Sequence, residues 1–307
     1  MRRIIIDSDT AADDCFAIMA AACHPQATLE AITIVAGNVV FDQQVENALL
    51  TLEAAGRTDV PIHLGARRPL LRPWRGASAH GDGKGNHDFA TPTGRARSRR
   101  AVSALLDAVD ADPGEIDLVC IGPLTNVALA LTEDRDLPDK VRSLTIMGGC
   151  DNAIGNVTAA AEYNFWVDPE AARAVLEAGF DPTIVTWTLT RNQAVWSRER
   201  LDEIATWDTM LSRFFTIVNA PNADWNEGVG IAGSTHPDSL TAMLLLRPDL
   251  ITARSRAYVN VETQGEMTRG YSIMDRRTDR HQPNAWVVDE IDGDGFFEAM
   301  REILLSR

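Results

Sequence analysis

Short apolar runs rich in β-branched residues alternate with longer helical patterns along most of the chain. The runs are nearly continuous in apolar residues, as expected for parallel strands that helices cover on both faces. A series of strand-helix-strand units of this kind folds as a doubly wound α/β protein. We therefore predict an α/β fold with one mostly parallel sheet. The expected strands are RRIIID (2–7), LEAITIVAG (29–37), PIHLG (61–65), IDLVCIG (116–122), SLTIMGG (143–149) and TIVTWTL (183–189).

The pattern changes after residue 250. Two runs, SRAYVNVETQG (255–265) and TRGYSIMDRRTD (268–279), are separated by Gly265 and a polar turn. This arrangement predicts a β-hairpin appended to the main sheet, followed by a final helix over 293–305. Because no linker is apparent, we expect a single domain over residues 1–307.

The net charge of the chain indicates which classes of ligand it can bind. The chain has 44 acidic and 29 basic residues, a net charge of −15. This balance argues against a nucleic-acid or anionic-membrane surface, since both need clustered Lys and Arg. A small neutral substrate or a cation suits it better. The four cysteines lack metal-site spacing and no run approaches the length of a membrane span, so we expect a cytoplasmic protein.

Four carboxylates follow the first strand within eight positions: Asp7, Asp9, Asp13 and Asp14. Two of them held about 4 Å apart repel each other by roughly 4 kcal/mol at an effective dielectric constant of ~20. One explanation is that Asp13 or Asp14 caps a helix that starts near Cys15. The other is an oxygen-rich site for a divalent cation such as calcium or magnesium.

Other polar residues follow the later strands at their carboxyl ends, where ligands bind in open α/β sheets. Asn38 follows the second strand, Thr125 and Asn126 follow IDLVCIG, and Met147 precedes the two glycines that end SLTIMGG. We therefore expect the carboxylate cluster to lie at a ligand site.

Two further segments have both structural and functional interpretations. Asn156, Glu162 and Asn164 lie in a loop (148–165), where they either satisfy backbone groups or bind a ligand rich in hydroxyls. Asp168 followed by Pro169 predicts a helix start. Further along, Asp238 has the pattern of a helix N-cap. Trp74, Trp196 and Trp225 lie in stretches without regular patterning, where they either stack on a base or cover the surface.

Taken together, these motifs resemble the inosine-uridine preferring nucleoside hydrolase family. Its members cleave the N-glycosidic bond of ribonucleosides with a bound calcium ion. The similarity spans almost the whole chain, in order: IIIDSDTAADD (4–14), TIVAGN (33–38), HGDGKG (80–85), IGPLTNVALAL (121–131), IMGG (146–149), GNVTAAAEYNFWVDPEAA (155–172), DSLTAMLLLRPDL (238–250) and VETQGEMTRGYSIMD (261–275).

The resemblance implies a role for each matched position. It implies that calcium is bound by Asp9, Asp14, the backbone carbonyl of Thr125 and Asp238, with Asp7 supporting the cluster from behind. It places Asp13 on the ribose hydroxyls. The remaining ribose-pocket positions are Asn38, Met147, Asn156, Glu162 and Asn164. A water on the calcium ion would pass its proton to Asp9 and attack the anomeric carbon, giving ribose and a free base.

The chain departs from the family pattern in two places. Thr10 and Ala11 replace the usual Pro-Gly, and Pro237 stands where relatives carry His or Trp before the last metal-binding Asp. His236 is then the nearest candidate for the acid that protonates the leaving base, with His87 as a second choice. The alternative for His236 is that it points to solvent beside a helix cap.

The resemblance implies a nucleoside as substrate, and we expect a homodimer or homotetramer. Two other functions remain open. One is hydrolysis of a different N-riboside, with a modified base or nicotinamide. The other is calcium-dependent binding of a nucleoside or ribose without turnover.

Overall fold

A nine-stranded sheet forms the centre of the protein, which is described here by a computed structural model covering residues 1–83, 89–277 and 279–306. The strand order is β10-β9-β11-β6-β5-β4-β1-β2-β3. All neighbouring pairs from β3 to β11 are parallel, and β9 is antiparallel to both of its neighbours. The strands are β1 (Arg2–Ser8), β2 (Ala27–Ile34), β3 (Ile62–Leu64), β4 (Ile116–Cys120), β5 (Ser143–Met147), β6 (Thr183–Val185), β9 (Ile251–Val261), β10 (Ser272–Asp275) and β11 (Ala285–Ile291).

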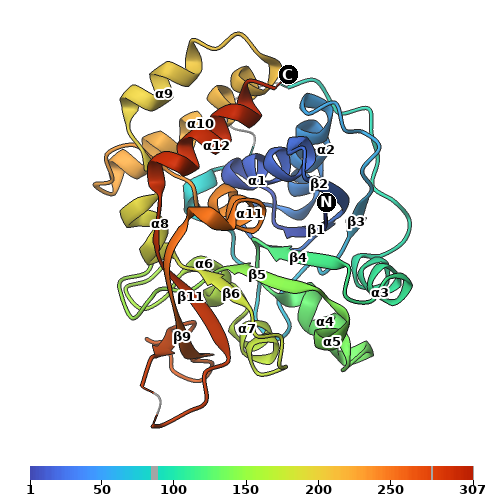
Figure 1. Cartoon of the computed structure of the whole chain (residues 1–307), viewed down its shortest axis with the longest axis vertical. Helices are drawn as coiled ribbons and strands as arrows, with labels where there is room; N and C mark the ends of the chain where they lie inside the picture. Colours follow the sequence, from blue (N-terminus) through green and yellow to red (C-terminus); the bar gives the residue numbers. More distant parts are fainter. Residues whose placement is uncertain (84–88, 278, 307) are drawn as a thin grey trace.

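Helices cover both faces of this sheet (Figure 1). Each face has its own cluster of buried apolar side chains. On one face lie α1 (Ala12–Cys23), α2 (Phe41–Ala54), α10 (Met210–Gly228), α11 (Pro237–Leu246) and α12 (Gly293–Leu304). On the other lie α3 (Ala101–Ala111), α4 (Thr125–Glu133), α5 (Leu137–Lys140) and α7 (Pro169–Leu176). The predicted α/β fold with a mostly parallel sheet is confirmed, while the single domain over 1–307 stays a prediction.

The helix α1 lies in the middle of its layer. It is apolar nearly all round, with the run Cys15–Ala22 fully buried, which is typical of a helix enclosed by other elements. Its alanines permit close approach to α11, its main packing partner. This packing brings the first turn of α1 against the first turn of α11, and both turns carry carboxylates of the predicted site.

The predicted hairpin exists and lies at one edge of the main sheet. Strands β9 and β10 pair antiparallel, with Ser272 opposite Val261. The hairpin is joined to β6 through β11, which lies between β6 and β9. The hairpin is therefore appended to the edge of the main sheet, as predicted. We did not predict β11 from the sequence.

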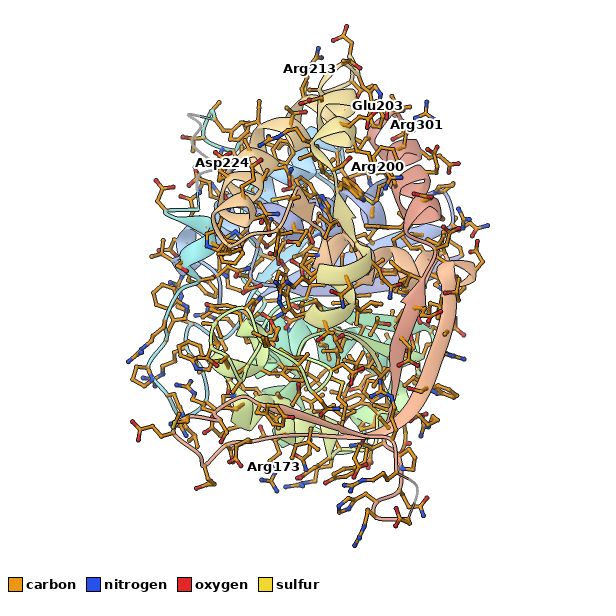
Figure 2. The ribbon with its side chains drawn as sticks, turned by 90° about the vertical axis from the view of Figure 1, so that its left-hand side faces the viewer. Arg173, Arg200, Glu203, Arg213, Asp224 and Arg301 are labelled. Atoms are coloured by element: carbon orange, nitrogen blue, oxygen red, sulfur yellow. The ribbon has the colours of Figure 1, made fainter. Side chains whose placement is uncertain are left out.

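The segment between β6 and α11 is more regular than expected. It contains α8 (Trp187–Gln193), α9 (Arg198–Ala205), α10 and a small antiparallel pair of β7 (Val195–Trp196) and β8 (Ser234–Thr235). Trp196 is therefore in a strand and Trp225 in a helix, so the irregular surroundings predicted for these two residues were wrong. Figure 2 shows Arg200 and Glu203 of α9 close to Arg301 of α12, where Glu203 and Arg301 form an ion pair.

Shorter elements complete the chain: α6 (Tyr163–Val167) and the 3-10 turns η1 (Ser78–His80) and η2 (Pro248–Leu250). Across the described ranges, every helix is too short or too polar to cross a membrane.

Candidate active site

The carboxyl ends of β2, β1, β4 and β5, which are adjacent in the sheet, carry the predicted polar residues. Asp9 follows β1, Asn38 follows β2, Thr125 begins the helix after β4, and Met147 ends β5. The sheet hydrogen bonding continues past the strand ends, from Ile121 N to the Asp7 carbonyl over 2.9 Å. This continuation fixes the loops that hold the site, as expected for an open α/β sheet.

Asp9 is completely buried at the end of β1. Its Oδ2 accepts a hydrogen bond of 2.8 Å from the backbone N–H of Asn38, while its Oδ1 has no partner among the described residues. Two glycines lie next to the Asp9 carboxylate. A Cβ on Gly37 would lie 1.9 Å from Oδ2, and one on Gly122 would lie 2.9 Å from Oδ1. The carboxylate can occupy this position only because both residues lack a side chain, a requirement that we did not predict.

Asp14 lies beside Asp9, in the first turn of α1. It accepts hydrogen bonds from the Ser8 hydroxyl over 2.7 Å, the Ala11 N–H over 3.0 Å and the Asn38 amide over 3.3 Å. The helix begins at Ala12 and not near Cys15, so Asp14 is inside the helix and is not its N-cap. Its bond to the Ala11 N–H is the return half of a capping box, which is a structural role beside any role toward a ligand.

Burial and mutual repulsion raise the pKa values of these carboxylates. Burial raises the pKa of Asp9, and the nearby charge of Asp14 raises it further. Burial also raises the pKa of Asp14 to about 6 and lifts that of Asp238, which additionally feels Asp14, Asp13 and Asp9. Among the described residues, no three His, Cys, Asp or Glu side chains are arranged so that they alone could hold a metal ion. A cation here would therefore also need carbonyl or amide oxygens, which calcium accepts.

Asp7 occupies a separate position in β1. It accepts hydrogen bonds from the Thr33 hydroxyl and the Asn126 amide. Burial raises the pKa of Asp7 to about 7, because these two donors do not replace the lost water.

Asp13 caps a helix distant in the sequence. Its Oδ2 accepts from the backbone N–H groups of Asp238, at 2.5 Å, and Ser239, at 3.2 Å. Its Oδ1 accepts from the Ser239 hydroxyl at 2.8 Å and lies 3.2 Å from His236 Nδ1. The prediction that Asp238 is an N-cap was wrong: α11 begins at Pro237, and Asp13 satisfies the N–H groups of its first turn. Asp238 is the second residue of the helix and lines the site.

The loop before α7 supplies the opposite wall. Glu162 caps α6 by accepting from the N–H groups of Asn164 and Phe165, and it also accepts from Gly149 N. Burial raises the pKa of Glu162 to about 7. The Asn164 amide donates to the carbonyls of Ile121 and Met147. These side chains therefore satisfy backbone groups and also form the site. The expected Asp168 cap is confirmed, since Asp168 accepts from Ala171 N at 3.1 Å.

A cavity of about 700 Å³, counted with the solvent at its mouth, opens between these walls. Seven predicted residues line it: Asp13, Asn38, Met147, Asn156, Glu162, Asn164 and Asp238. Four others are not among its described lining residues: Asp9, Asp14, Thr125 and His236. The first three are buried, Asp9 after β1 and Asp14 and Thr125 in the first turns of α1 and α4.

Several cavity residues had no predicted role, among them His80, Trp187 and Asn222. Trp225, considered as a stacking residue from the sequence, lines the cavity, whereas Trp196 is 1% exposed and inaccessible to a base. Burial lowers the pKa of His80 to about 4, so its imidazole is neutral at pH 7. His80 lies in the HGDGKG motif, which was a signal for it in the sequence.

His236 lies neither at the solvent nor at the cavity. It is completely buried and packs against Trp196, with 3.9 Å between ring centroids. The structure therefore does not bring the expected leaving-group acid to the site, and the solvent-facing alternative was wrong. His87, the second choice, lies outside the described residues.

The chain is similar to known nucleoside hydrolases over its whole length. The sequence profile of the family described as inosine-uridine preferring nucleoside hydrolase matches residues 4–298. The non-specific ribonucleoside hydrolase RihC of Salmonella paratyphi C is 37% identical over 303 residues, covering 98% of this chain and 96% of that protein. The solved structure of a plant nucleoside hydrolase, PpNRh1, matches with a TM-score of 0.94 and 28% identity, over 100% of this chain and 99% of the other. An inosine-guanosine nucleoside hydrolase matches with a TM-score of 0.89 and 28% identity, over 99% of this chain and 98% of the other.

Proposed function

Because the chain belongs to the inosine-uridine preferring nucleoside hydrolase family and is an N-glycosidic bond hydrolase, we propose that it cleaves ribonucleosides to ribose and free base through a water deprotonated by Asp9. The observation that carries this proposal is the cavity at the strand ends. Its walls gather carboxylate and amide side chains, and the buried carboxylate of Asp9 adjoins it. Such a lining suits the hydroxyls of a ribose better than an apolar ligand.

We propose calcium as the cofactor, held by Asp9, Asp14, the Thr125 carbonyl and Asp238. The fit is supported by the donor set, which consists of oxygens alone, and by Asp9 Oδ1, a buried carboxylate oxygen with no partner in the described part of the chain. When bound, calcium would lower the pKa of water and neutralise the mutual repulsion of these carboxylates.

Side chains of the protein supply the other parts of the proposed mechanism. Asp9, held on Oδ2 by the Asn38 N–H, would accept a proton from the attacking water. Asp13 and Glu162 line the cavity with carboxylates whose hydrogen bonds fix their orientation. As the bond to the base breaks, the ribose gains positive charge, which such fixed negative groups stabilise.

We propose that a different group of lining residues faces the base. His80 and Trp225 line the cavity together with Trp187 and Asn222. A tryptophan offers a stacking surface for a base. We propose Trp225 for that role and His80 as the group that donates a hydrogen bond to the leaving base, because it is an imidazole at the cavity wall.

A panel of ribosides tests the function. Purified protein is incubated in calcium with inosine, uridine, a modified-base riboside and nicotinamide riboside, and both base and ribose are quantified. We expect equimolar base and ribose from the common ribonucleosides. Release from nicotinamide or modified-base riboside alone would favour the second enzymatic function, and binding without release would favour a non-catalytic nucleoside-binding protein.

The family resemblance also supports a cytoplasmic homodimer or homotetramer. Light scattering coupled to size-exclusion chromatography measures the mass of the assembly. A mass equal to the 33.6 kDa chain would contradict the proposed oligomer.

A further inference from the structure

The imidazole of His236 is enclosed by three aromatic side chains, Trp196, Phe215 and Phe16, which we call the aromatic box. Its ring centroid lies 3.9 Å from that of Trp196, 5.8 Å from Phe215 and 6.0 Å from Phe16. These rings come from β7, α10 and α1, so three elements converge on one imidazole. The packing fixes the ring plane, since a completely buried side chain between three aromatic rings has no room to turn.

We propose that His236 is a positioning residue, which donates its Nδ1–H to Asp13 and so aims that carboxylate into the ribose end of the cavity. This inference rests on the proposed function, because it assigns Asp13 to the ribose. It differs from the role suggested by the sequence, in which His236 protonates the base. The chemistry that depends on His236 is then recognition of the sugar and not departure of the leaving group.

The contacts of Asp13 support this role. Each carboxylate oxygen has two donors: His236 Nδ1 and the Ser239 hydroxyl on Oδ1, and the N–H groups of Asp238 and Ser239 on Oδ2. Of these, the imidazole is the donor that the aromatic box holds in place. It therefore ties the orientation of Asp13 to the packing of α1, α10 and β7.

The geometry also selects the tautomer. His236 Nε2 is buried and has no partner within the described ranges. A proton on Nε2 would leave a buried N–H group without an acceptor, which is unfavourable. It would also place the lone pair of Nδ1 against the negatively charged Asp13 carboxylate, which is unfavourable too. A proton on Nδ1 instead makes a hydrogen bond to a charged acceptor, one of the stronger kinds.

Three substitutions separate positioning from acid catalysis. His236→Asn keeps an amide donor near the place of Nδ1, His236→Gln places one near Nε2, and His236→Phe keeps a ring without a donor. Each variant is assayed on inosine and on p-nitrophenyl riboside, whose leaving group departs without protonation. Thermal unfolding of each variant reports whether the fold is kept.

We expect His236→Phe and His236→Gln to lose roughly 10- to 100-fold in kcat/KM, by the same factor on both substrates, because a displaced carboxylate affects the sugar common to both. His236→Asn should recover most of that loss. A loss on inosine alone would assign acid catalysis to His236 and overturn the proposal. The proposal would also be overturned if all three variants had the same kcat/KM, or if a folded His236→Asn variant were no more active than His236→Phe.

A measurement on the unaltered protein keeps the inference testable if the variants do not fold. Nitrogen-15 NMR of histidine-labelled protein distinguishes protonated from bare ring nitrogens, and the six histidines are assigned by comparison with single substitutions. We expect His236 with a proton on Nδ1 and none on Nε2. The reverse tautomer would refute the inference, whether or not the protein hydrolyses nucleosides, while failure of the wild type to cleave either riboside would refute only the proposed function.

Discussion

Replacement of Gly37 by alanine tests the placement of Asp9 without changing any polar group. The added Cβ would lie 1.9 Å from Asp9 Oδ2, whereas ordinary contacts begin at 3.4 Å. The carboxylate must therefore retreat by about 1.5 Å, and a displacement of about 1 Å in a reacting group can lower the rate by ~10²-fold. We expect Gly37→Ala to lose at least ~10²-fold in kcat and about 1–3 kcal/mol in the free energy of unfolding, the usual cost of overpacking.

The assay is ribose release from inosine, with urea unfolding on the same samples. Gly122→Ala should have a smaller effect, since its Cβ would stand 2.9 Å from Oδ1. Gly228→Ala is the matched control: it lies at the exposed end of α10, where an added Cβ would meet no described atom within 4 Å. A Gly37→Ala protein with wild-type kcat would refute the argument that Asp9 must sit between these glycines.

The remaining predictions concern the cation, the sugar and pH. Protein purified without chelator should contain one calcium ion per chain by elemental analysis; no stoichiometric metal together with EDTA-resistant activity would contradict this. Ribosides should be cleaved up to ~10⁴-fold faster than 2′-deoxyribosides, because a site built to pair hydroxyls rejects analogues that lack them; equal rates would contradict it. In chelator, the free energy of unfolding should fall as pH rises from 5 to 8. Burial raises the native pKa of Asp7 and Glu162 to about 7, so the native state holds more protons than the unfolded state at intermediate pH. The stabilisation is present below the ordinary pKa values and is lost as pH rises through 7, by up to about 1.4 kcal/mol per pH unit per group; urea unfolding that is flat across this range would contradict it.

The sheet could be predicted from the sequence because parallel strands buried on both faces leave continuous apolar runs. The same logic located Asp9, Asn38 and Met147 at one edge, since the carboxyl ends of neighbouring parallel strands meet. Strand β11 was missed because its pattern is neither continuous nor alternating: buried Val287 and Val288 are followed by the more exposed Asp289 and Glu290. The hairpin beyond it was predicted correctly because its two strands are close in the sequence.

The details of the site depended on contacts between distant residues. A helix cap is predicted from the residues next to it, yet the first turn of α11 is capped by Asp13, 225 positions from Asp238. The burial of His236 likewise depends on Phe16 and Trp196, which no local pattern connects to it. Trp225 was assigned to an irregular stretch because Pro221 interrupts the helical pattern of α10.

The most direct test of the central claim compares wild-type protein with Asp9→Asn in calcium-buffered, phosphate-free solution, with base and ribose from inosine and uridine quantified together. The substitution removes the proposed proton acceptor and one charge from a repulsive cluster, so the variant should fold. We predict equimolar base and ribose from the wild type, loss of that release after chelation, and no detectable turnover by a folded Asp9→Asn variant. Hydrolysis by the folded variant at the wild-type rate would contradict the account.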